Sequence, residues 1–192
     1  LGHSVVYNDV SAEMYQKAQN LAQQQSLDTQ ISWHHSPYQD LDNLGQFDLV
    51  LCHAVIEWLA HPGSLVAHIR RFVAEGGRLS LAFYNQNGLV YRNLIRGNFR
   101  LLEADFKPDI GSLTPIHPLL PAQVAAWLEA SELSPCWSSG IRVFHDYVTT
   151  VRGGHEDPKS VIEMELKHSL IEPYKWLGRY IHFIAETELS RP

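Results

Sequence analysis

Several features that mark large classes of protein are missing from this sequence. No apolar run approaches the ~20 residues that a membrane span requires, and no positively charged start leads into an apolar stretch like that of a secretory signal. None of the eleven histidines falls in HExxH or in another metal-ligand spacing, so we predict no metal site. Repeats and low-complexity tracts are missing as well, which leaves a globular protein without a membrane partner.

Cysteine is scarce, and the two that occur, Cys52 and Cys136, show no CxxC spacing. Both lie among apolar residues, so buried free thiols in a reducing compartment are the simplest interpretation, and we expect a cytoplasmic protein. Basic residues are also fewer than acidic ones, and the formal net charge is -6 with histidine neutral. This argues against a broad nucleic-acid surface but leaves a local basic patch open.

The chain of 192 residues alternates strand and helix patterns, and we expect a single domain over residues 1–192. Apolar runs predict strands over 4–7, 31–35, 47–54, 78–85, 140–151 and 178–188. Helical spacing predicts helices over 11–25, with Ser11 as N-cap, and over 63–74, 87–102, 121–130 and 158–171. A loop is expected over 103–120. The alternation favours an α/β fold with a mostly parallel, Rossmann-like sheet and helices on both faces.

Polar or aromatic residues follow the ends of four predicted strands. They are Asn8-Asp9 and Tyr84-Asn85, together with residues 36–40 and 53–58. Ligands of parallel sheets bind outside the carboxyl ends of the strands. We therefore expect these residues to converge on one edge of the sheet and to form the site.

Longer segments of the sequence resemble a known family. FDLVLCHAVIEW, EGGRLSLAFYN, GNF, GIRVFHDY and EPYKWLGRYIH together resemble the class I S-adenosylmethionine-dependent methyltransferases, and among them the tRNA 5-carboxymethoxyuridine methyltransferases. The resemblance implies a sheet whose final strand is antiparallel, and S-adenosylmethionine as cofactor. It also implies that the carboxylate of a modified wobble uridine in tRNA is converted into its methyl ester.

The sequence departs from that family in two places. Family members carry an N-terminal helix, a first strand and a glycine-rich loop ahead of the segment that begins here at Leu1, so we expect the first strand to be missing from this chain. The strands SVVY and FDLVLCHA would then have unpaired edges, and we expect marginal stability or a homo-oligomer. The loop DFKPDIG (105–111) is nearly neutral and offers little to tRNA phosphates.

The resemblance also implies which residues bind the cofactor. Asp9, with Val10 beside it, would accept hydrogen bonds from the two ribose hydroxyls, which a carboxylate does well; its alternative is a helix cap or a surface acid. The other implied residues are Met14, Tyr38 and Gln39 at the adenine and His53 beside the sulfonium. The alternative for Met14 is a core methionine, for Tyr38 and Gln39 a polar turn, and for His53 a core histidine.

A carboxylate acceptor needs cations rather than a general base, because it is already ionised at neutral pH. The enzyme must hold it in line with the S–CH3 bond, so positioning and desolvation supply most of the rate. Arg142, His145 and Arg179 are the candidate cations, and Tyr84 and Asn85 are expected to meet the base or the methyl group. In a regular strand the side chains of residues 142 and 145 face opposite sides, so both reach one carboxylate only if the strand ends near residue 144. The alternative for Arg142 is an ion pair with Asp146.

Arginine recurs every four residues in the helix expected over 87–102. Arg92, Arg96 and Arg100 would share one face and form the basic patch for tRNA phosphates, unless that face is only solvated. Three hypotheses follow: a tRNA carboxyl methyltransferase, a methyltransferase of the same fold for a small molecule, and a non-catalytic remnant that cannot bind the cofactor.

Overall fold

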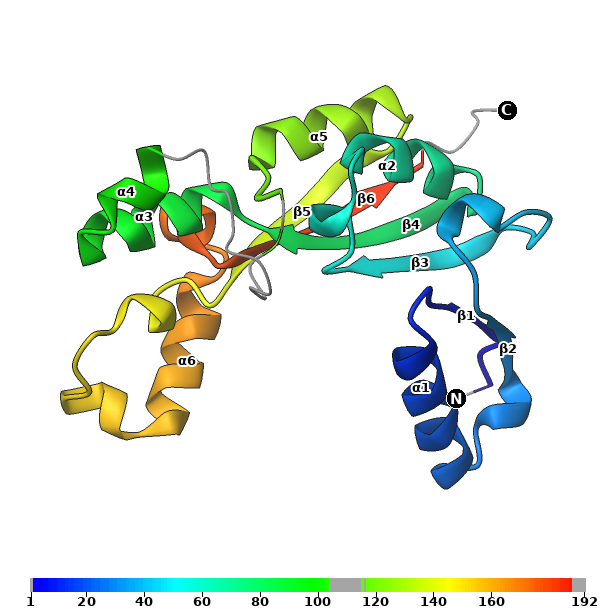
Figure 1. The fold of residues 1–192 in the computed structure, drawn as a ribbon, viewed down its shortest axis with the longest axis horizontal. Helices are drawn as coiled ribbons and strands as arrows, with labels where there is room; N and C mark the ends of the chain where they lie inside the picture. Colours follow the sequence, from blue (N-terminus) through cyan, green and yellow to red (C-terminus); the bar gives the residue numbers. More distant parts are fainter. Residues whose placement is uncertain (1, 104–114, 116, 188–192) are drawn as a thin grey trace. The chain divides into compact units, whose positions relative to one another are not determined.

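The computed structural model describes residues 2–103, 115 and 117–187, which fall into two compact units, residues 1–45 and 46–192 (Figure 1). Each unit is described by itself. The expected single domain over residues 1–192 therefore stays a prediction.

The first unit is a pair of parallel strands with one helix. β1 (Val5–Asn8) pairs with β2 (Ile31–His34), and α1 (Ala12–Gln24) connects them. As predicted, Ser11 caps α1, since its hydroxyl accepts a hydrogen bond from the Met14 amide at 3.3 Å. The rings of Tyr7, Tyr15 and Trp33 pack together with centroids 5.3–6.5 Å apart, and they form the small core between the helix and the strands.

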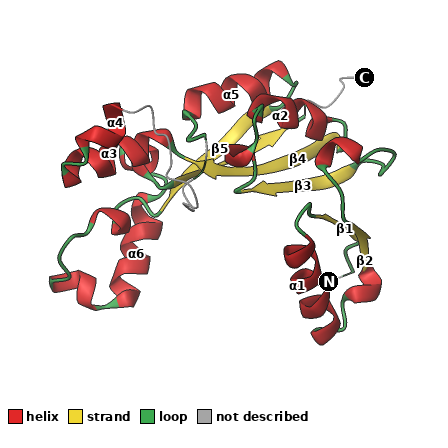
Figure 2. Ribbon diagram, in the orientation of Figure 1, coloured by secondary structure: helices red, strands yellow, loops and turns green. Residues whose placement is uncertain are grey.

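The second unit is built on a four-stranded mixed sheet (Figure 2). Its order is β3 (Phe47–His53), β4 (Val73–Tyr84), β6 (Tyr180–Glu186) and β5 (Ser134–Ile141). β3 and β4 are parallel, whereas β6 runs antiparallel to both β4 and β5. The expectation of an antiparallel final strand is confirmed.

Two helices cover one face of this sheet, α2 (Pro62–Arg70) and α5 (Pro121–Ala130) (Figure 1). Alternating residues of β6 are buried, as in a half-covered strand, whereas β4 is buried at every position from Leu79 to Tyr84. The inward set is Leu79, Leu81, Phe83, Ile181, Phe183 and Ala185 from the strands, and Leu65, Val66, Val124 and Leu128 from the helices. Each large apolar side chain buried in this way contributes about 1.5–3 kcal/mol.

The remaining helices follow the carboxyl ends of the strands. They are α3 (Gln86–Arg96), α4 (Phe99–Glu103) and α6 (Pro158–His168). The Asn85 side chain caps α3, and Gly97 ends it with φ 70°, a left-handed conformation that suits glycine. The expected continuous helix over 87–102 is therefore wrong. Arg92 and Arg96 lie on α3, but Arg100 lies on α4.

The pair Gly76-Gly77 forms part of a strand rather than a helix stop. α2 ends at Arg70, not at residue 74, and β4 already begins at Val73. The pairing with β3 jumps from Phe47–Val73 to Leu49–Arg78, so β4 carries extra residues that bulge. A Cβ on Gly77 would lie 2.8 Å from the Ala74 carbonyl oxygen, which explains a glycine in the bulge.

The strand expected over 140–151 is wrong in position. β5 covers Ser134–Ile141 and stops because Arg142 has φ 59°, which no strand residue adopts. The following amides bond to a side chain instead of a strand: the Glu165 carboxylate accepts from Val143 at 2.6 Å and from His145 at 2.7 Å. Residues His145–Tyr147 form a 3-10 turn.

One cysteine differs from expectation. Cys52 is buried, but Cys136 is exposed, next to the irregular pairing between Pro135 and Trp137 on the edge strand β5. Both are free thiols. Among residues 2–103, 115 and 117–187, no helix is long and apolar enough to cross a membrane.

Candidate active site

Two glycines bring separate chain segments into backbone contact at the end of β5. A Cβ on Gly178 would lie 2.8 Å from the Gly140 Cα, and one on Gly140 would lie 2.2 Å from the Lys175 carbonyl oxygen, so neither position accepts a side chain. Just beyond this crossing the Arg179 amide donates to the Arg142 carbonyl at 3.3 Å. Two arginines that are 37 positions apart in the sequence therefore lie side by side.

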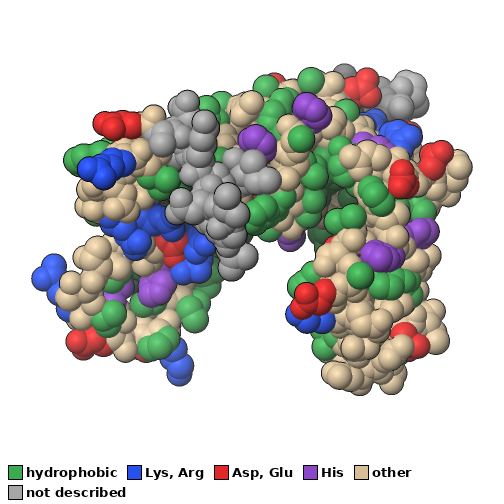
Figure 3. All heavy atoms as spheres, in the orientation of Figure 1, with side chains coloured by type: hydrophobic (Ala, Val, Ile, Leu, Met, Phe, Trp, Pro, Cys, Tyr) green, Lys and Arg blue, Asp and Glu red, His purple; other side chains and the backbone are tan. Residues whose placement is uncertain are grey.

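Arginines from three segments converge on one acid. The Arg142 guanidinium is ion-paired with Asp146 Oδ1, and Arg179 Nη1 lies 3.4 Å from Asp146 Oδ2. From α3, Arg96 donates to the Asp146 carbonyl at 2.9 Å. We call Arg92, Arg96, Arg142 and Arg179 the arginine cluster. Figure 3 shows basic side chains gathered around an acidic one between α3 and α6.

Positive charge exceeds negative charge in the arginine cluster. The Asp146 side chain is 7% exposed and is the acid within it. The Nε of Arg179 is buried without a hydrogen-bond partner among the described residues. Buried charged groups require partners, so the cluster has guanidinium donors that an added anion can use.

Aromatic rings form one wall of the cluster. Tyr84 and Tyr180 pair across β4 and β6 with ring centroids 5.5 Å apart, and the Arg179 guanidinium lies 5.9 Å from each ring. Arg92 reaches the Tyr84 hydroxyl at 3.5 Å. Tyr84 is only 3% exposed. The structure thus brings Tyr84 together with Arg142 and Arg179, as the sequence predicted, while contact of Tyr84 with an acceptor stays a prediction.

Asn85 and His145 lie next to the cluster in different ways. The Asn85 amide donates to the carbonyls of Trp176 and Gly178, both at 2.8 Å, and its oxygen accepts from Asn87. The side chain therefore fastens the loop before β6 to the start of α3. His145 is exposed and precedes Asp146 in the 3-10 turn. Roles of both residues toward an acceptor stay predictions.

Glu57 is a buried acid that the sequence pattern did not single out. It lies in the 3-10 turn Ile56–Trp58, its exposure is 0%, and neither carboxylate oxygen has a hydrogen-bond partner among the described residues. Burial raises its pKa to about 7, and the nearby backbone amides of Glu57 and Tyr84 oppose that rise. The signal in the sequence was an acid inside the otherwise apolar segment HAVIEW (53–58).

Asp146 and Tyr147 were also missed as parts of the site. Asp146 entered only as the alternative partner of Arg142, and that ion pair is present. The Tyr147 hydroxyl donates to the Leu177 carbonyl and ties the turn to the loop before β6. The segment HDY could have indicated both residues, because it places an acid beside an aromatic hydroxyl between two arginine-bearing segments.

In the first unit, Asp9 follows β1 as predicted. Its Oδ1 accepts from the Ser11 amide at 2.8 Å and its Oδ2 from the Tyr7 hydroxyl at 3.3 Å. A carboxylate has about four lone-pair positions, so each oxygen retains room for one further donor. Val10 and Met14 beside it are 67% and 45% exposed. An acid with spare acceptor capacity among exposed apolar side chains fits a nucleoside, and Asp9 is not the cap of α1.

The end of β2 lies against the end of β1. The Ser36 hydroxyl donates to Asn8 Oδ1 at 3.4 Å, and His35 Nε2 lies 3.2 Å from the Val10 carbonyl. Tyr38 and Gln39 follow in the 3-10 turn Tyr38–Asp40. The structure therefore brings together the predicted cofactor residues of the first unit at one strand edge, and their contacts with a cofactor stay predictions.

His53 ends β3 in the second unit and is part of a polar row. Its Nε2 lies 2.8 Å from the Ser80 hydroxyl, which lies 2.7 Å from His182 Nε2. Burial, with His53 nearby, lowers the pKa of His182. His53 is hydrogen-bonded but exposed, so its alternative as a core histidine is wrong, and its role beside the sulfonium stays a prediction.

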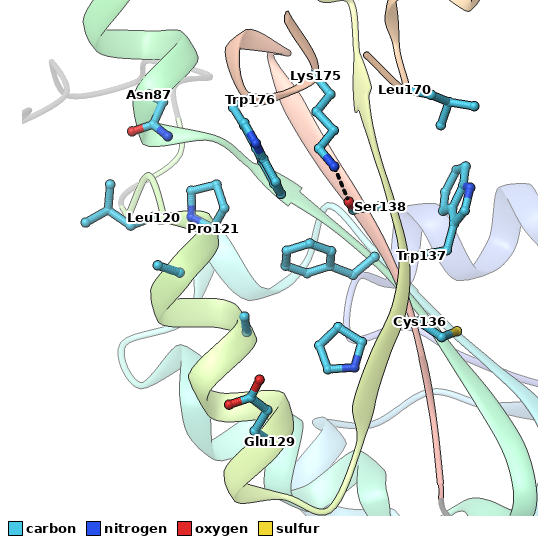
Figure 4. Close-up of a pocket in the computed structure, with 14 residues that line it drawn as sticks. Asn87, Leu120, Pro121, Glu129, Cys136, Trp137, Ser138, Leu170, Lys175 and Trp176 are labelled. Atoms are coloured by element: carbon cyan, nitrogen blue, oxygen red, sulfur yellow. Dashed lines mark hydrogen bonds between the residues drawn. The ribbon is translucent and has the colours of Figure 1, made fainter. Parts of the chain in front are cut away.

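A separate cavity lies between α5 and β5 (Figure 4). Its volume is about 900 Å³, and its walls are mostly apolar and include Phe183 and Trp176. Lys175 Nζ lies 3.2 Å from the Ser138 hydroxyl and 4.5 Å from the Trp176 ring centroid. Of the described residues that line this cavity, none was predicted as a site residue. In the described part of the chain no group of three or more His, Cys, Asp or Glu could hold a metal ion.

Comparison with known proteins identifies the class. A family model described as a methyltransferase domain matches residues 1–81. The fold resembles the magnesium protoporphyrin IX methyltransferase of Synechocystis with bound SAH (TM-score 0.60, 16% identity, 97% of this chain and 65% of that one). It also resembles a geranyl diphosphate methyltransferase in complex with SAM (TM-score 0.57, 13% identity, 97% and 69%). The chain is a class I S-adenosylmethionine-dependent methyltransferase, which confirms the expected fold class, enzyme class and cofactor.

A relative of known sequence narrows this class to a family. The tRNA 5-carboxymethoxyuridine methyltransferase of Escherichia coli is 36% identical over 193 residues, which cover 99% of this chain and 74% of the relative. The chain belongs to the family of that enzyme, and the resemblance stated from its sequence is confirmed.

Proposed function

We propose that this protein transfers a methyl group from S-adenosylmethionine to the carboxylate of 5-carboxymethoxyuridine at the wobble position of tRNA and so forms the methyl ester. The name of the E. coli relative supports the substrate. The observation that carries the proposal is the arginine cluster, in which, among the described residues, four guanidinium groups stand against one acid, Asp146.

The acceptor carboxylate needs no base, because it is ionised well below neutral pH. Arg179, whose buried Nε has no partner among the described residues, and Arg142, half exposed on its outer side, would hold it. A guanidinium offers five donors in a planar fork. Asp146 therefore occupies only some of the N–H donors of each arginine, and the remaining donors can bind a second carboxylate.

Asp146 would orient the two arginines. It fixes both guanidinium planes from the buried side, so they need no rearrangement when the acceptor binds. Rate then comes from holding the reacting oxygen in line and away from water. Tyr84, under the Arg179 guanidinium, and Asn85, which fastens the neighbouring loop, would keep that arrangement rigid.

The cofactor supplies an activated methyl group when it is bound. Asp9 would accept hydrogen bonds from its ribose hydroxyls with the lone pairs that Tyr7 and Ser11 leave over. Val10, Met14, Tyr38 and Gln39 would contact the adenine, and His53 would lie on the methionine side.

The RNA would bind through its phosphates to the same side of the second unit. Arg92 and Arg96 point from α3 into the cluster, and Arg100 follows on α4. We expect these three to neutralise phosphates close to the acceptor nucleotide. Binding should then weaken steeply as salt is raised.

The test uses tRNA that carries 5-carboxymethoxyuridine and S-adenosylmethionine labelled in the methyl group. Label should appear in that nucleoside after digestion, and mild alkali should release it as methanol, because esters hydrolyse where N-methyl and C-methyl groups do not. Label that resists alkali, or no transfer to tRNA at any pH, would refute the proposal.

A second arm separates tRNA from a small-molecule substrate. The free nucleoside 5-carboxymethoxyuridine presents the same carboxylate without neighbouring phosphates. Reversing the charge of Arg100, which lies on α4 outside the arginine cluster, should reduce activity on tRNA but spare the free nucleoside. Arg152, an exposed arginine outside the cluster, gives the matched control Arg152→Glu.

A further inference from the structure

Glu57 lies where β4 loses its neighbour β3. The last hydrogen bond between these segments runs from the Ala54 amide to the Ala82 carbonyl at 2.8 Å. Ala54 then adopts φ 55° and turns the chain away from the sheet. The Tyr84 amide, two residues further along β4, is the strand group near the Glu57 carboxyl that favours its charged form. The acid thus lies beside the amide of Tyr84, whose ring belongs to the aromatic wall of the arginine cluster.

Burial without partners makes this carboxyl sensitive to its electrostatic surroundings. Neither oxygen forms a hydrogen bond within the described residues, and the side chain is completely buried. An ionised carboxylate in such a place is unfavourable, so the group keeps its proton to a pKa of about 7. A small change in nearby charge will therefore change how much of it is protonated near neutral pH.

The groups that face Glu57 connect it to the arginine cluster. Burial raises the pKa of Tyr180, while the Arg179 guanidinium lowers it and Glu57 raises it, so both charged groups lie near this phenol. The titratable or charged groups that face the acid are Cys52 from β3, Tyr84 from β4, Tyr180 with Arg179 from the start of β6, and His117, whose amide donates to the Glu57 carbonyl at 3.0 Å. From α2 the buried side chains are apolar: Leu65, Val66 and Ile69.

We propose that Glu57 is a positioning residue whose protonation is coupled to binding of the anionic acceptor at the arginine cluster. When Glu57 is neutral, the positive charge of Arg179 attracts the acceptor carboxylate without competition. When Glu57 is ionised, it places a second negative charge behind Tyr84 and Tyr180, which weakens the attraction between Arg179 and the acceptor. Above neutral pH, acceptor binding then takes up one proton from solvent, which converts the Glu57 carboxylate into the acid.

This inference rests on the proposed function, since it assumes a carboxylate acceptor. The KM for the acceptor should rise as the pH increases from 6 to 8, by up to about tenfold, because one unit of pKa coupling corresponds to tenfold in affinity. The value of kcat should change little over the same range, because Glu57 does not touch the reacting atoms.

The deciding experiment compares the wild type with Glu57→Gln, using the free nucleoside 5-carboxymethoxyuridine as the acceptor. The amide keeps the shape and stays neutral, so its KM should be low and independent of pH. Glu163→Gln removes an exposed acid of α6 and is the matched control, which should keep the wild-type pH profile. A Glu57→Gln profile that rises with pH as the wild type does would overturn the inference.

Calorimetry on the wild type gives a second measurement that needs no variant. At pH 8, heats of nucleoside binding in buffers of different ionisation enthalpy should report uptake of up to one proton. Heats independent of the buffer would also overturn the inference. Failure of the proposed function looks different, because then no methyl ester forms in tRNA at any pH.

Discussion

The second unit contains two concave regions that differ in almost every property. The cavity between α5 and β5 has a volume of about 900 Å³, apolar walls and one lysine, whose charge Glu172 balances at 3.0 Å. The arginine cluster has hardly any open volume, about 10 Å³, yet among the described residues its four guanidinium groups stand against one acid, Asp146. For an anionic substrate, unbalanced charge marks the site better than empty space does.

Small side chains explain why the cavity is open, and backbone contact explains why the side chains of the cluster are crowded. On the α5 side the cavity is lined by Pro121, Ala122 and Ala125, which cannot fill the distance to the strand. In the cluster, Gly140 and Gly178 let two backbones touch, so the side chains that follow are crowded together. One region is open because its side chains are too short to fill it, and the other is closed because its side chains are crowded together.

The most direct test of whether the cluster or the cavity binds the acceptor is to truncate one arginine. Arg179→Ala leaves Asp146 and the acceptor with one guanidinium fewer, and losing one partner of a buried charge pair costs about 3 kcal/mol. We expect kcat/KM for the acceptor to fall by about 100-fold, with binding of S-adenosylmethionine unchanged by calorimetry. Trp176→Ala, which enlarges the cavity, should change kcat/KM by less than about threefold. Equal losses in both variants would contradict the distinction.

A second comparison concerns the buried acid behind the cluster and an exposed acid in the cavity. The pKa of Glu57 is raised to about 7 from an ordinary 4.5, so its contribution to stability is present below pH 4.5 and is lost as the pH rises through 7. Glu57→Gln should therefore increase the free energy of unfolding at pH 8 by about 2 kcal/mol, and should change it far less at pH 5. Urea unfolding at both pH values measures this.

The matched variant for that experiment is Glu129→Gln. Glu129 lines the cavity from α5 and is exposed, so the same substitution should leave unfolding within about 0.5 kcal/mol of the wild type at both pH values. If Glu129→Gln gained as much stability at pH 8 as Glu57→Gln, general charge reduction rather than burial would be the cause.

Removing the fixed negative charge from the cluster should separate binding from turnover. Asp146→Asn keeps the shape of the side chain but frees Arg142 and Arg179 from their common partner. The more positive cluster should hold the acceptor more tightly, so KM falls, while loss of orientation lowers kcat by about tenfold. Steady-state kinetics on the free nucleoside would show both, and an unchanged kcat would exclude an orienting role.

The smallest effect is expected from filling the cavity. Ala125→Leu adds apolar volume beside Phe183 without touching the cluster. Activity should stay within about twofold of the wild type, and stability should change by about 1 kcal/mol or less. A larger loss of activity, at unchanged melting temperature, would show that the cavity takes part in substrate binding.

The sequence correctly predicted the structural features that depend on short segments of the chain. Apolar runs located the strands around Phe83 and Phe183, and polar caps such as Ser11 located helix starts within one or two residues. It also placed Arg142 and Arg179 in one site, although only through a family resemblance. These features are local, so a pattern of a dozen residues contains them.

The errors came from contacts between distant segments. The end of β5 depends on Glu165, which takes the amides of Val143 and His145, and no pattern near residue 142 contains that information. Glu57 was not predicted as a site residue, because its burial depends on contacts of the turn Ile56–Trp58 with β4 and α2. The two pairing partners of Asp146 are likewise separated by 37 residues, so the cluster becomes visible only when the chain is folded.

The contact between Gly140 and Gly178 links the backbone to the charge pattern of the site. These residues have no side chain and no charge, yet they fix where two positive charges meet. An alanine at Gly178 would push the crossing segments apart and carry the Arg179 guanidinium away from Asp146. In an activity assay this uncharged exchange would therefore resemble the deletion of an arginine, and a sequence comparison that scores charge alone would miss it.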